Sequence, residues 1–198
     1  MAHFAAEGGV LTVSVVVCGA ARSGKSSLLR GIHERLGAGR QSSEESPSTQ
    51  FVPVDWLPLE LGTIGERRVV AQLYAAPELS ASDGTRRMLF RDADGVIFVA
   101  DAQAARFDAN LLAFHHMTDS VQARGADGRD VPIVLVYTKT DLPTELVLPP
   151  SALDESLNFN RVPSFVVDAV RGTGVREALQ ALLTVVLRRH ASPIVSDE

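Results

Sequence analysis

The chain has 198 residues, of which 45% are hydrophobic, so it has the length of about one domain and enough apolar side chains for a core. Its formal net charge of −5 gives no general reason to expect nucleic-acid binding. The single cysteine, Cys18, excludes an internal disulfide and fits a cytoplasmic protein in which this residue is a small buried hydrophobe. No apolar run reaches the ~18 residues of a membrane span, and neither end carries a signal-peptide or lipidation motif, so we expect no intrinsic membrane anchor.

Short apolar segments alternate with segments of helical periodicity along the chain. Strands are predicted at residues 10–18, 50–61, 67–74, 95–100, 131–137 and 162–167. Helices are predicted at residues 26–36, 85–92, 106–124, 151–157 and 174–189. Continuous apolar strands that alternate with helices predict an α/β fold, with a mostly parallel sheet of these six strands covered by helices on both faces. A turn at 62–66 predicts a hairpin, and so one antiparallel edge strand, in a single domain of residues 10–190 with flexible termini at 1–9 and 191–198.

A glycine-rich loop lies between the first predicted strand and the first predicted helix. Its sequence, Gly19-Ala20-Ala21-Arg22-Ser23-Gly24-Lys25-Ser26, matches the pattern G-x-x-x-x-G-K-[ST]; the alternative is a chance match in a glycine-bearing turn. The glycines let the backbone curl with its N–H groups pointing inward, and the helix start adds a partial positive charge, so the loop suits a phosphate. Lys25 is expected to reach the β- and γ-phosphates of a nucleotide and Ser26 to bind Mg²⁺, with Ser27 completing the phosphate-binding set.

Lysine is rare in this chain. The only two lysines are Lys25 and Lys139, against seventeen arginines. The phosphate loop requires a compact ammonium group on a flexible stem, where a planar guanidinium would not fit. We therefore predict that Lys139 also performs a task that arginine cannot.

The segment Thr138-Lys139-Thr140-Asp141 follows a buried strand, at the end of the sheet where ligands of open α/β sheets bind. A carboxylate only accepts hydrogen bonds, so Asp141 would select guanine, which presents an N1–H beside a 2-amino group, over adenine. The stem of Lys139 would lie along the plane of the base, and Leu142 belongs to the same predicted site. The alternative is a polar turn before Pro143.

The last predicted strand ends in Asp168-Ala169-Val170, which we include in the nucleotide site. A backbone N–H here, that of Ala169, is a candidate donor to the guanine carbonyl. The alternative is an ordinary strand-to-helix loop.

With these motifs the chain resembles the Ras-like small GTPases over residues 10–189. Residues 55–62 and 93–103 are similar to a bacterial subgroup, the MglA-like GTPases of gliding motility and cell polarity. The resemblance implies a P-loop NTPase fold, binding of GTP or GDP with Mg²⁺, and protein partners that include a roadblock-type activator and effectors. In such proteins the hairpin strand lies at the sheet edge beside the switch loops, which predicts a partner surface on Phe51–Leu61. Trp56 is then either part of this interface or part of the core.

The chain departs from the family where the γ-phosphate would lie. The family has a glycine that binds the γ-phosphate and then a glutamine that orients water, and this chain has Glu78 and Leu79 there. Glu78 brings negative charge towards phosphate, and Leu79 has no group that could orient water. Ala75 replaces the acidic residue at the start of this loop. We therefore expect very slow or absent intrinsic hydrolysis and no certain catalytic residue.

The first switch loop departs as well. The family threonine that completes Mg²⁺ coordination aligns with Phe51, which leaves Thr49 as the nearby candidate metal ligand. The arginine that MglA-like proteins place just before that threonine aligns with Gln50, which leaves Arg40 as the candidate in-chain arginine.

Three functions remain open on the sequence. The first is a GTP-binding switch with slow or partner-dependent hydrolysis. The second is a non-catalytic guanine-nucleotide-binding scaffold that acts through protein contacts. The third is an unrelated phosphotransferase that uses ATP, for which no acceptor site is recognisable in the sequence.

Overall fold

The computed structural model describes residues 9–37, 55–76, 83–124 and 131–191, with 83–86 and 191 described by their backbone only. The strands are β1 (Val10–Gly19), β2 (Trp56–Ile64), β3 (Arg67–Ala75), β4 (Gly95–Asp101), β5 (Ile133–Thr138) and β6 (Ser164–Val167). The helices are α1 (Lys25–Leu36), α2 (Asp83–Arg91), the 3₁₀ turn η1 (Ala104–Arg106), α3 (Phe107–Gln122), α4 (Pro150–Leu157) and α5 (Val175–Ala191). Element ends differ from the predicted ends mostly by one to three residues, as is usual at helix and strand termini.

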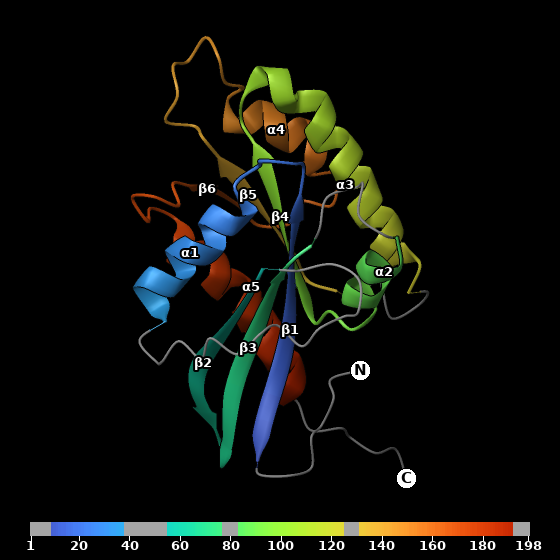
Figure 1. Ribbon diagram of the computed structural model, residues 1–198, viewed down its shortest axis with the longest axis vertical. Helices are drawn as coiled ribbons and strands as arrows, with labels where there is room; N and C mark the ends of the chain where they lie inside the picture. The colour runs from blue at the N-terminus through green and yellow to red at the C-terminus, as the bar shows by residue number, and fades with distance from the viewer. Residues whose placement is uncertain (1–8, 38–54, 77–82, 125–130, 192–198) are drawn as a thin grey trace.

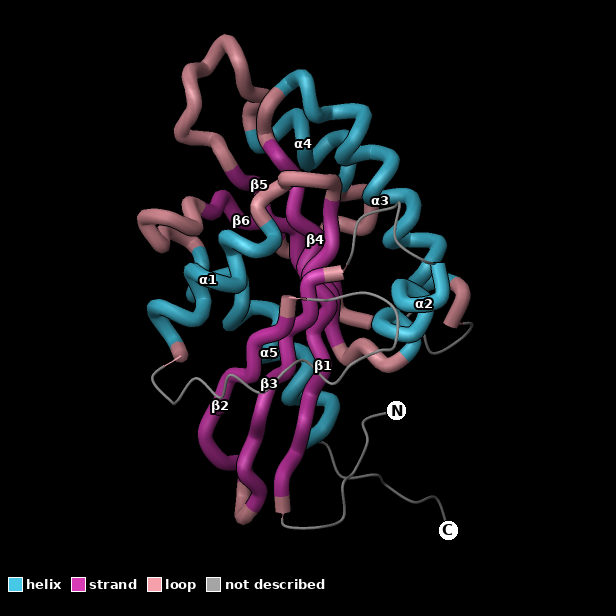
Figure 2. The backbone as a smooth tube through the Cα atoms, in the orientation of Figure 1, coloured by secondary structure: helices cyan, strands magenta, loops and turns pink. Residues whose placement is uncertain are grey.

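The strands form one sheet in the order β2-β3-β1-β4-β5-β6 (Figures 1 and 2). Every neighbouring pair is parallel except β2 and β3, which are antiparallel. The predicted fold class, a Ras-like P-loop α/β domain with one antiparallel edge strand, is therefore confirmed. Strand β1 lies between β3 and β4. The chain therefore places β2 and β3 on one side of β1 within the sheet, and β4, β5 and β6 on the other side. Such a switch point is where ligands bind in open α/β sheets, and the glycine-rich loop lies there.

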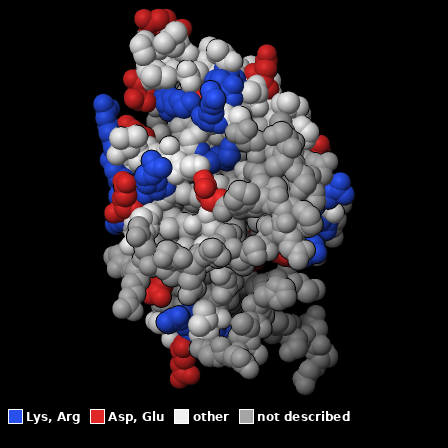
Figure 3. Space-filling model, viewed as in Figure 1, with Lys and Arg blue, Asp and Glu red and all other residues white. Residues whose placement is uncertain are grey.

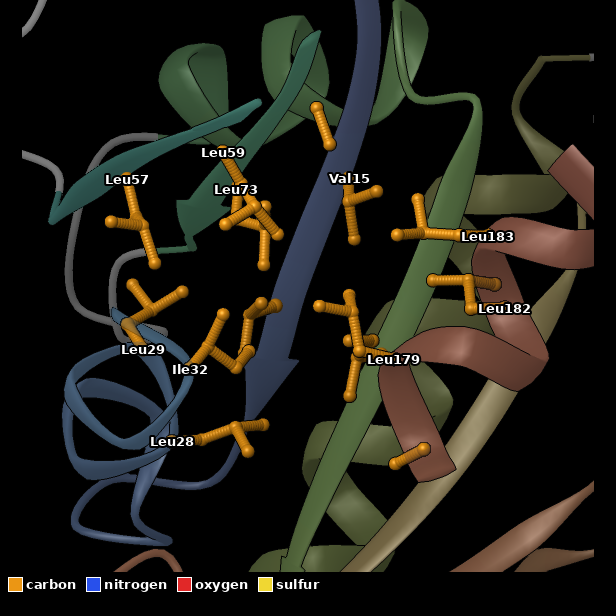
Figure 4. Close-up of a cluster of buried hydrophobic side chains, with 14 of the residues drawn as sticks. Val15, Leu28, Leu29, Ile32, Leu57, Leu59, Leu73, Leu179, Leu182 and Leu183 are labelled. Carbon is orange, nitrogen blue, oxygen red and sulfur yellow. The ribbon is translucent and has the colours of Figure 1, made fainter. Parts of the chain in front are cut away.

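Helices pack on both faces of the sheet and divide the core into two clusters. One cluster joins α1 and α5 to the sheet through Leu28, Leu29, Ile32, Leu57, Leu59, Leu73, Leu179 and Leu182 (Figure 4). The other joins α2, α3 and α4 to the opposite face through Phe90, Met117, Leu153 and Leu157. All seven residues of β4 are buried because both of its faces are covered. The first half of β1 instead alternates buried and half-buried residues, because only one of its faces is covered there.

The hairpin differs from the prediction. The segment 62–66 was expected to be a turn, but β2 continues to Ile64 and only Gly65 and Glu66 connect it to β3. The pairing register shifts between Glu60 and Gly62, where Gly62 has φ of 101°. A bulge of this kind lets a strand continue past an extra residue, which the alternating pattern of apolar residues does not reveal.

The start of the predicted edge strand is only partly visible. Residues 50–54 lie outside the described part of the chain, and Asp55 precedes the strand. Trp56 is half-buried and belongs to neither core cluster, and it pairs across the hairpin with Tyr74. Successive residues of a strand point to opposite faces, so Trp56 lies on the face opposite that of Leu57, which packs against α1 and α5.

Among the described residues, no helix has the length and apolar character that crossing a membrane would require.

Candidate functional site

The glycine-rich loop connects the end of β1 to the start of α1 at the switch point of the sheet. Two of its positions admit only glycine. A Cβ on Gly19, whose φ is 143°, would lie 2.1 Å from the carbonyl oxygen of Val99 on β4. Gly24 caps α1 with φ of 104°, in the left-handed region that costs glycine little. The loop therefore curls tightly against the sheet, as a phosphate cradle requires.

Lys25 begins α1 and folds back over the loop. Its ammonium Nζ donates to the carbonyl oxygens of Gly19 at 3.1 Å and Ala20 at 2.8 Å. The residue is only 9% exposed, although it carries a charge. Charged side chains are rarely this buried without compensation, so the cation is held above the loop by backbone dipoles. Figure 3 shows Lys and Arg side chains gathering on the upper part of this face, where Figure 1 places the start of α1 and the ends of β4 and β5.

The end of β5 is bonded to the same loop. The Thr138 hydroxyl donates to the Ser23 carbonyl at 2.7 Å, and Lys139 Nζ donates to the Arg22 carbonyl at 2.9 Å. The predicted phosphate loop and the predicted base-binding segment are thus in direct contact, although Ser23 and Thr138 are 115 residues apart in the chain. Lys139 itself has φ of 60°, in the left-handed region.

Lys139 also forms an ion pair with Asp101, whose carboxylate is fully buried at the end of β4. The distance from Lys139 Nζ to Asp101 Oδ2 is 2.5 Å. The amide and side chain of Gln103 donate to the same carboxylate at 3.0–3.1 Å. Lysine at position 139 therefore neutralises a buried charge, a role that the sequence did not reveal.

We predict that Lys139→Ala destabilises the protein even without any ligand. The substitution leaves the buried Asp101 carboxylate without its cation, so we expect the free energy of unfolding to fall by about 3 kcal/mol. This value is near the low end for a broken buried ion pair because Gln103 still donates hydrogen bonds to the carboxylate. Urea unfolding of nucleotide-free protein measures this loss. Adding Asp101→Asn should recover most of it, while Arg91→Ala, which removes an exposed ion pair, should change nothing measurable. Equal midpoints for wild type and Lys139→Ala would contradict the structural role.

Asp141 lies three residues beyond the end of β5. It is exposed, and no partner for its carboxylate is found within the described ranges. The Leu142 amide bonds weakly to the Lys139 carbonyl at 3.4 Å, which closes the turn that carries Asp141. Both oxygens of this carboxylate can therefore accept hydrogen bonds from a ligand.

The loop after β6 lies beside this turn, because β5 and β6 are parallel neighbours with Thr138 opposite Val167. The Asp168 carboxylate accepts the amides of Val170 at 3.0 Å and Arg171 at 2.9 Å. The Val170 amide is thus used within the loop itself, while the Ala169 amide bonds to no acceptor in the described part of the chain.

Helix α1 also holds this loop. Arg35 donates to the Val170 carbonyl at 2.9 Å, and the Ala169 carbonyl lies so close to Gly31 that a Cβ there would approach it to 2.7 Å. The phosphate loop, the β5 end and this loop therefore form one connected surface at the same edge of the sheet.

A carboxylate that the sequence reasoning missed lies beside Ser26. The Ser26 hydroxyl donates to Asp55 Oδ2 at 2.5 Å, and both residues are exposed. Asp55 is brought there because its carbonyl accepts the amide of Ala75, at the end of the neighbouring strand. Ala75 is the position where the family has an acidic residue, and here a carboxylate comes instead from Asp55, which directly precedes the antiparallel partner strand β2. The hairpin prediction together with the missing charge at 75 was the signal that could have identified Asp55.

A hydroxyl and a carboxylate at this spacing are suitable oxygen ligands for Mg²⁺, which usually keeps few protein ligands and completes its shell with water and phosphate oxygens. Within the described residues there is no group of three or more His, Cys, Asp or Glu side chains placed to hold a metal ion.

The remaining predicted site residues lie outside the described ranges. They are Thr49, the candidate metal ligand, Arg40, the candidate in-chain arginine, and Glu78 and Leu79, the residues that depart from the family at the γ-phosphate.

Cys18, at the end of β1, is a buried core residue rather than a reactive one. Burial raises the pKa of its thiol to about 12, and the nearby Lys25 only partly opposes this shift. The thiol is therefore uncharged at neutral pH and packs with the α2, α3 and α4 cluster.

Comparison with known proteins gives two relatives. No protein-family model matches the chain. The chain is 29% identical over 180 residues to the mutual gliding-motility protein MglA of Myxococcus xanthus, and the match covers 89% of this chain and 91% of that protein. It is 27% identical over 184 residues to the tRNA modification GTPase MnmE of Lawsonia intracellularis, covering 90% of this chain but only 35% of that protein.

The strand order, the phosphate loop and the near full-length match to MglA agree with one another. The match to MnmE concerns a part of that larger protein and is consistent with the same fold. These findings support placing the chain in the small GTPase superfamily, with similarity to MglA over nearly its whole length.

Proposed function

We propose that the protein is a guanine-nucleotide-binding switch that holds GTP or GDP with Mg²⁺. The observation that carries this proposal is the connection of the phosphate loop to the turn that bears Asp141, through the hydrogen bonds of Thr138 and Lys139. A nucleotide bound with its phosphates in the cradle would extend its base towards Asp141 and the Ala169 amide. The backbone amides of the loop, together with Lys25, supply the positive potential for the phosphates.

Guanine selectivity is the test of this proposal. In Asp141→Asn the carboxylate that would accept both guanine donors is replaced by an amide, which should weaken GDP binding about thirtyfold, equivalent to ~2 kcal/mol for a charged hydrogen bond. Xanthine carries an oxygen in place of the 2-amino group, so the variant should gain affinity for xanthosine diphosphate. Titration calorimetry with GDP, xanthosine diphosphate and ATP measures these changes.

The matched control is Glu145→Gln, which removes an exposed carboxylate from the same loop and should leave all three affinities unchanged. Equal affinity of the wild-type protein for GDP and ATP would refute guanine selectivity and favour the alternative function, a phosphotransferase that uses ATP.

Ser26 and Asp55 would hold Mg²⁺ in this function, with Thr49 as a further candidate ligand. When bound, the ion neutralises charge on the β- and γ-phosphates. The role of the protein is to place the hydroxyl and the carboxylate before the ion arrives, and the antiparallel pairing at Ala75 fixes the position of Asp55.

The cellular role that we propose is in bacterial motility or cell polarity, in the cytoplasm. It rests on the similarity to MglA, whose name describes a gliding-motility protein. We place the contact surface for protein partners, including a roadblock-type activator and effectors, on residues 51–61 and the adjoining switch loops. Among the described residues, strand β2 adjoins only β3, so we propose that its outer edge accepts another strand, with the aromatic side chain of Trp56 beside it.

A further inference from the structure

Arg106 makes a contact with the phosphate loop that none of the motifs predicts. It is the last residue of η1, the short turn that follows β4, and it is half-buried. Its guanidinium Nη2 donates to the carbonyl oxygen of Ala21 at 2.6 Å. A charge-assisted hydrogen bond of this length is among the stronger ones in proteins.

This bond completes a series along the loop. Each carbonyl from residue 19 to residue 23 accepts a hydrogen bond from a side chain. The donors are Lys25 for Gly19 and Ala20, Arg106 for Ala21, Lys139 for Arg22, and Thr138 for Ser23. A trans peptide directs its carbonyl and its N–H to opposite sides, so a carbonyl held from outside turns the following N–H inward. Arg106, Lys139 and Thr138 therefore set the direction of the amides of residues 22 to 24, whereas Lys25, which would face the ligand, does not hold its two carbonyls from outside.

The peptide between Ala21 and Arg22 has most need of such support. Arg22 has φ of 58°, a left-handed conformation that a residue with a side chain adopts only at a cost of about 1–2 kcal/mol. Such a conformation persists where the surroundings determine it strongly. The carbonyls on both sides of Arg22 are held, one by Arg106 and the other by Lys139.

We propose that Arg106 is a positioning residue for the phosphate site: it holds the Ala21 carbonyl outward so that the Arg22 amide faces the nucleotide phosphates. The proposal rests on the nucleotide binding proposed above, because the amide acts only on a ligand in the cradle. Loss of the bond allows the Ala21–Arg22 peptide to rotate towards a less strained conformation, which removes one donor from the site.

The turn that carries Arg106 is itself held rigidly. The side chain of Asn110, fully buried on α3, accepts the Asp101 amide at 3.1 Å and donates to the Asp101 carbonyl at 2.7 Å. The Ala104 amide bonds to the Leu146 carbonyl at 2.8 Å. Arg106 therefore projects from a fixed platform, as a residue that orients a binding loop must.

The test compares two substitutions at the same position. Arg106→Met keeps the aliphatic stem but removes the donor, and Arg106→Lys keeps a donor. We expect Met to speed the release of a fluorescent GDP analogue about tenfold, the effect of ~1.4 kcal/mol, and Lys to remain within about threefold of wild type. A non-hydrolysable GTP analogue should be released faster by the same factor, because the Arg22 amide serves both nucleotides.

Arg124→Met is the matched control. Its guanidinium likewise donates to backbone carbonyls, those of Phe90 at 3.1 Å and Ala93 at 2.5 Å, but it lies just beyond the other end of α3. It reports how much nucleotide release changes when an arginine–carbonyl contact elsewhere in the fold is lost, and we expect no change.

A second readout does not need nucleotide. The carbon chemical shift of the Ala21 carbonyl and the amide shifts of Arg22 should change in nucleotide-free Arg106→Met and stay near wild type in Arg106→Lys.

Wild-type release rates for Arg106→Met, or equal effects of Met and Lys, would overturn the proposal. So would an effect on the GTP analogue alone, which would indicate a direct contact between Arg106 and the γ-phosphate. If wild type binds no guanine nucleotide, the proposed function fails, and the carbonyl shift still decides whether Arg106 orients the peptide.

Discussion

Lys25→Ala protein is expected to purify without nucleotide and to bind GDP on the order of a thousandfold more weakly than wild type. Two charged hydrogen bonds to phosphate oxygens, at ~1.5–3 kcal/mol each, account for a loss of this size. The structure gives a further reason, because the Lys25 ammonium is almost fully buried above the loop and already bonded to the Gly19 and Ala20 carbonyls. Its position is set before a ligand arrives, so little ordering cost accompanies phosphate binding.

The measurement is the nucleotide content of purified protein, together with the thermal midpoint with and without GDP. Ligand at 100 times its dissociation constant stabilises a folded protein by about 2.7 kcal/mol, so wild type should show a clear upward shift and Lys25→Ala none. Arg30→Ala, an exposed position on the same helix, is the control and should behave like wild type. Lys25→Arg should fail almost as badly as Lys25→Ala, because a planar guanidinium does not fit the space of the ammonium. Nucleotide retained by Lys25→Ala would show that the phosphates lie elsewhere.

The parts of the site that follow from local sequence were predictable. The strand, glycine-rich loop and helix that form the predicted phosphate cradle are contiguous, and their pattern predicts the tight turn. The position of Lys139 and Asp141 after a buried strand was sufficient to place them at the same edge of the sheet. The mostly parallel sheet with one antiparallel edge strand followed from the alternation of strands with helices and from the hairpin.

The contacts that could not be predicted join residues far apart in the chain. The side chain of Arg106 reaches a loop 85 residues earlier, and that of Lys139 reaches Asp101, 38 residues earlier. Asp55 approaches Ser26 only because the hairpin brings its backbone to Ala75, and the bulge before Gly62 alters the register of that same hairpin. Sequence periodicity reports which face a residue occupies, but not which distant side chain occupies the facing position.

Intrinsic GTP hydrolysis is expected to be near zero, at or below the ~10⁻⁴ s⁻¹ of unassisted small GTPases. Glu78 and Leu79 stand where the family has the glycine that binds the γ-phosphate and the glutamine that orients water. Phosphoryl transfer depends on positioning and charge stabilisation, so each replacement removes a part of the catalytic machinery. In the proposed function, the described part of the site would bind phosphate through Lys25 and the loop amides, and Mg²⁺ through the Ser26–Asp55 pair. Among the described residues, these groups would hold GTP, and none of them is proposed to activate water.

Single-turnover hydrolysis with and without Mg²⁺ measures this prediction, in wild type and in Glu78→Gly/Leu79→Gln. The double substitution should raise the rate at least tenfold. It removes the Glu78 charge, gives the backbone there the freedom of glycine, and supplies a side chain that can orient water. Adding Asp55→Ala to it should abolish the gain if Asp55 helps to hold Mg²⁺, since the ion stabilises the charge that develops on the phosphates. A wild-type rate of about 1 s⁻¹ would show that this reading of residues 78 and 79 is wrong. A rate that stays at zero in the double variant, and in wild type with its partner, would instead identify the protein as a scaffold that binds nucleotide without hydrolysing it.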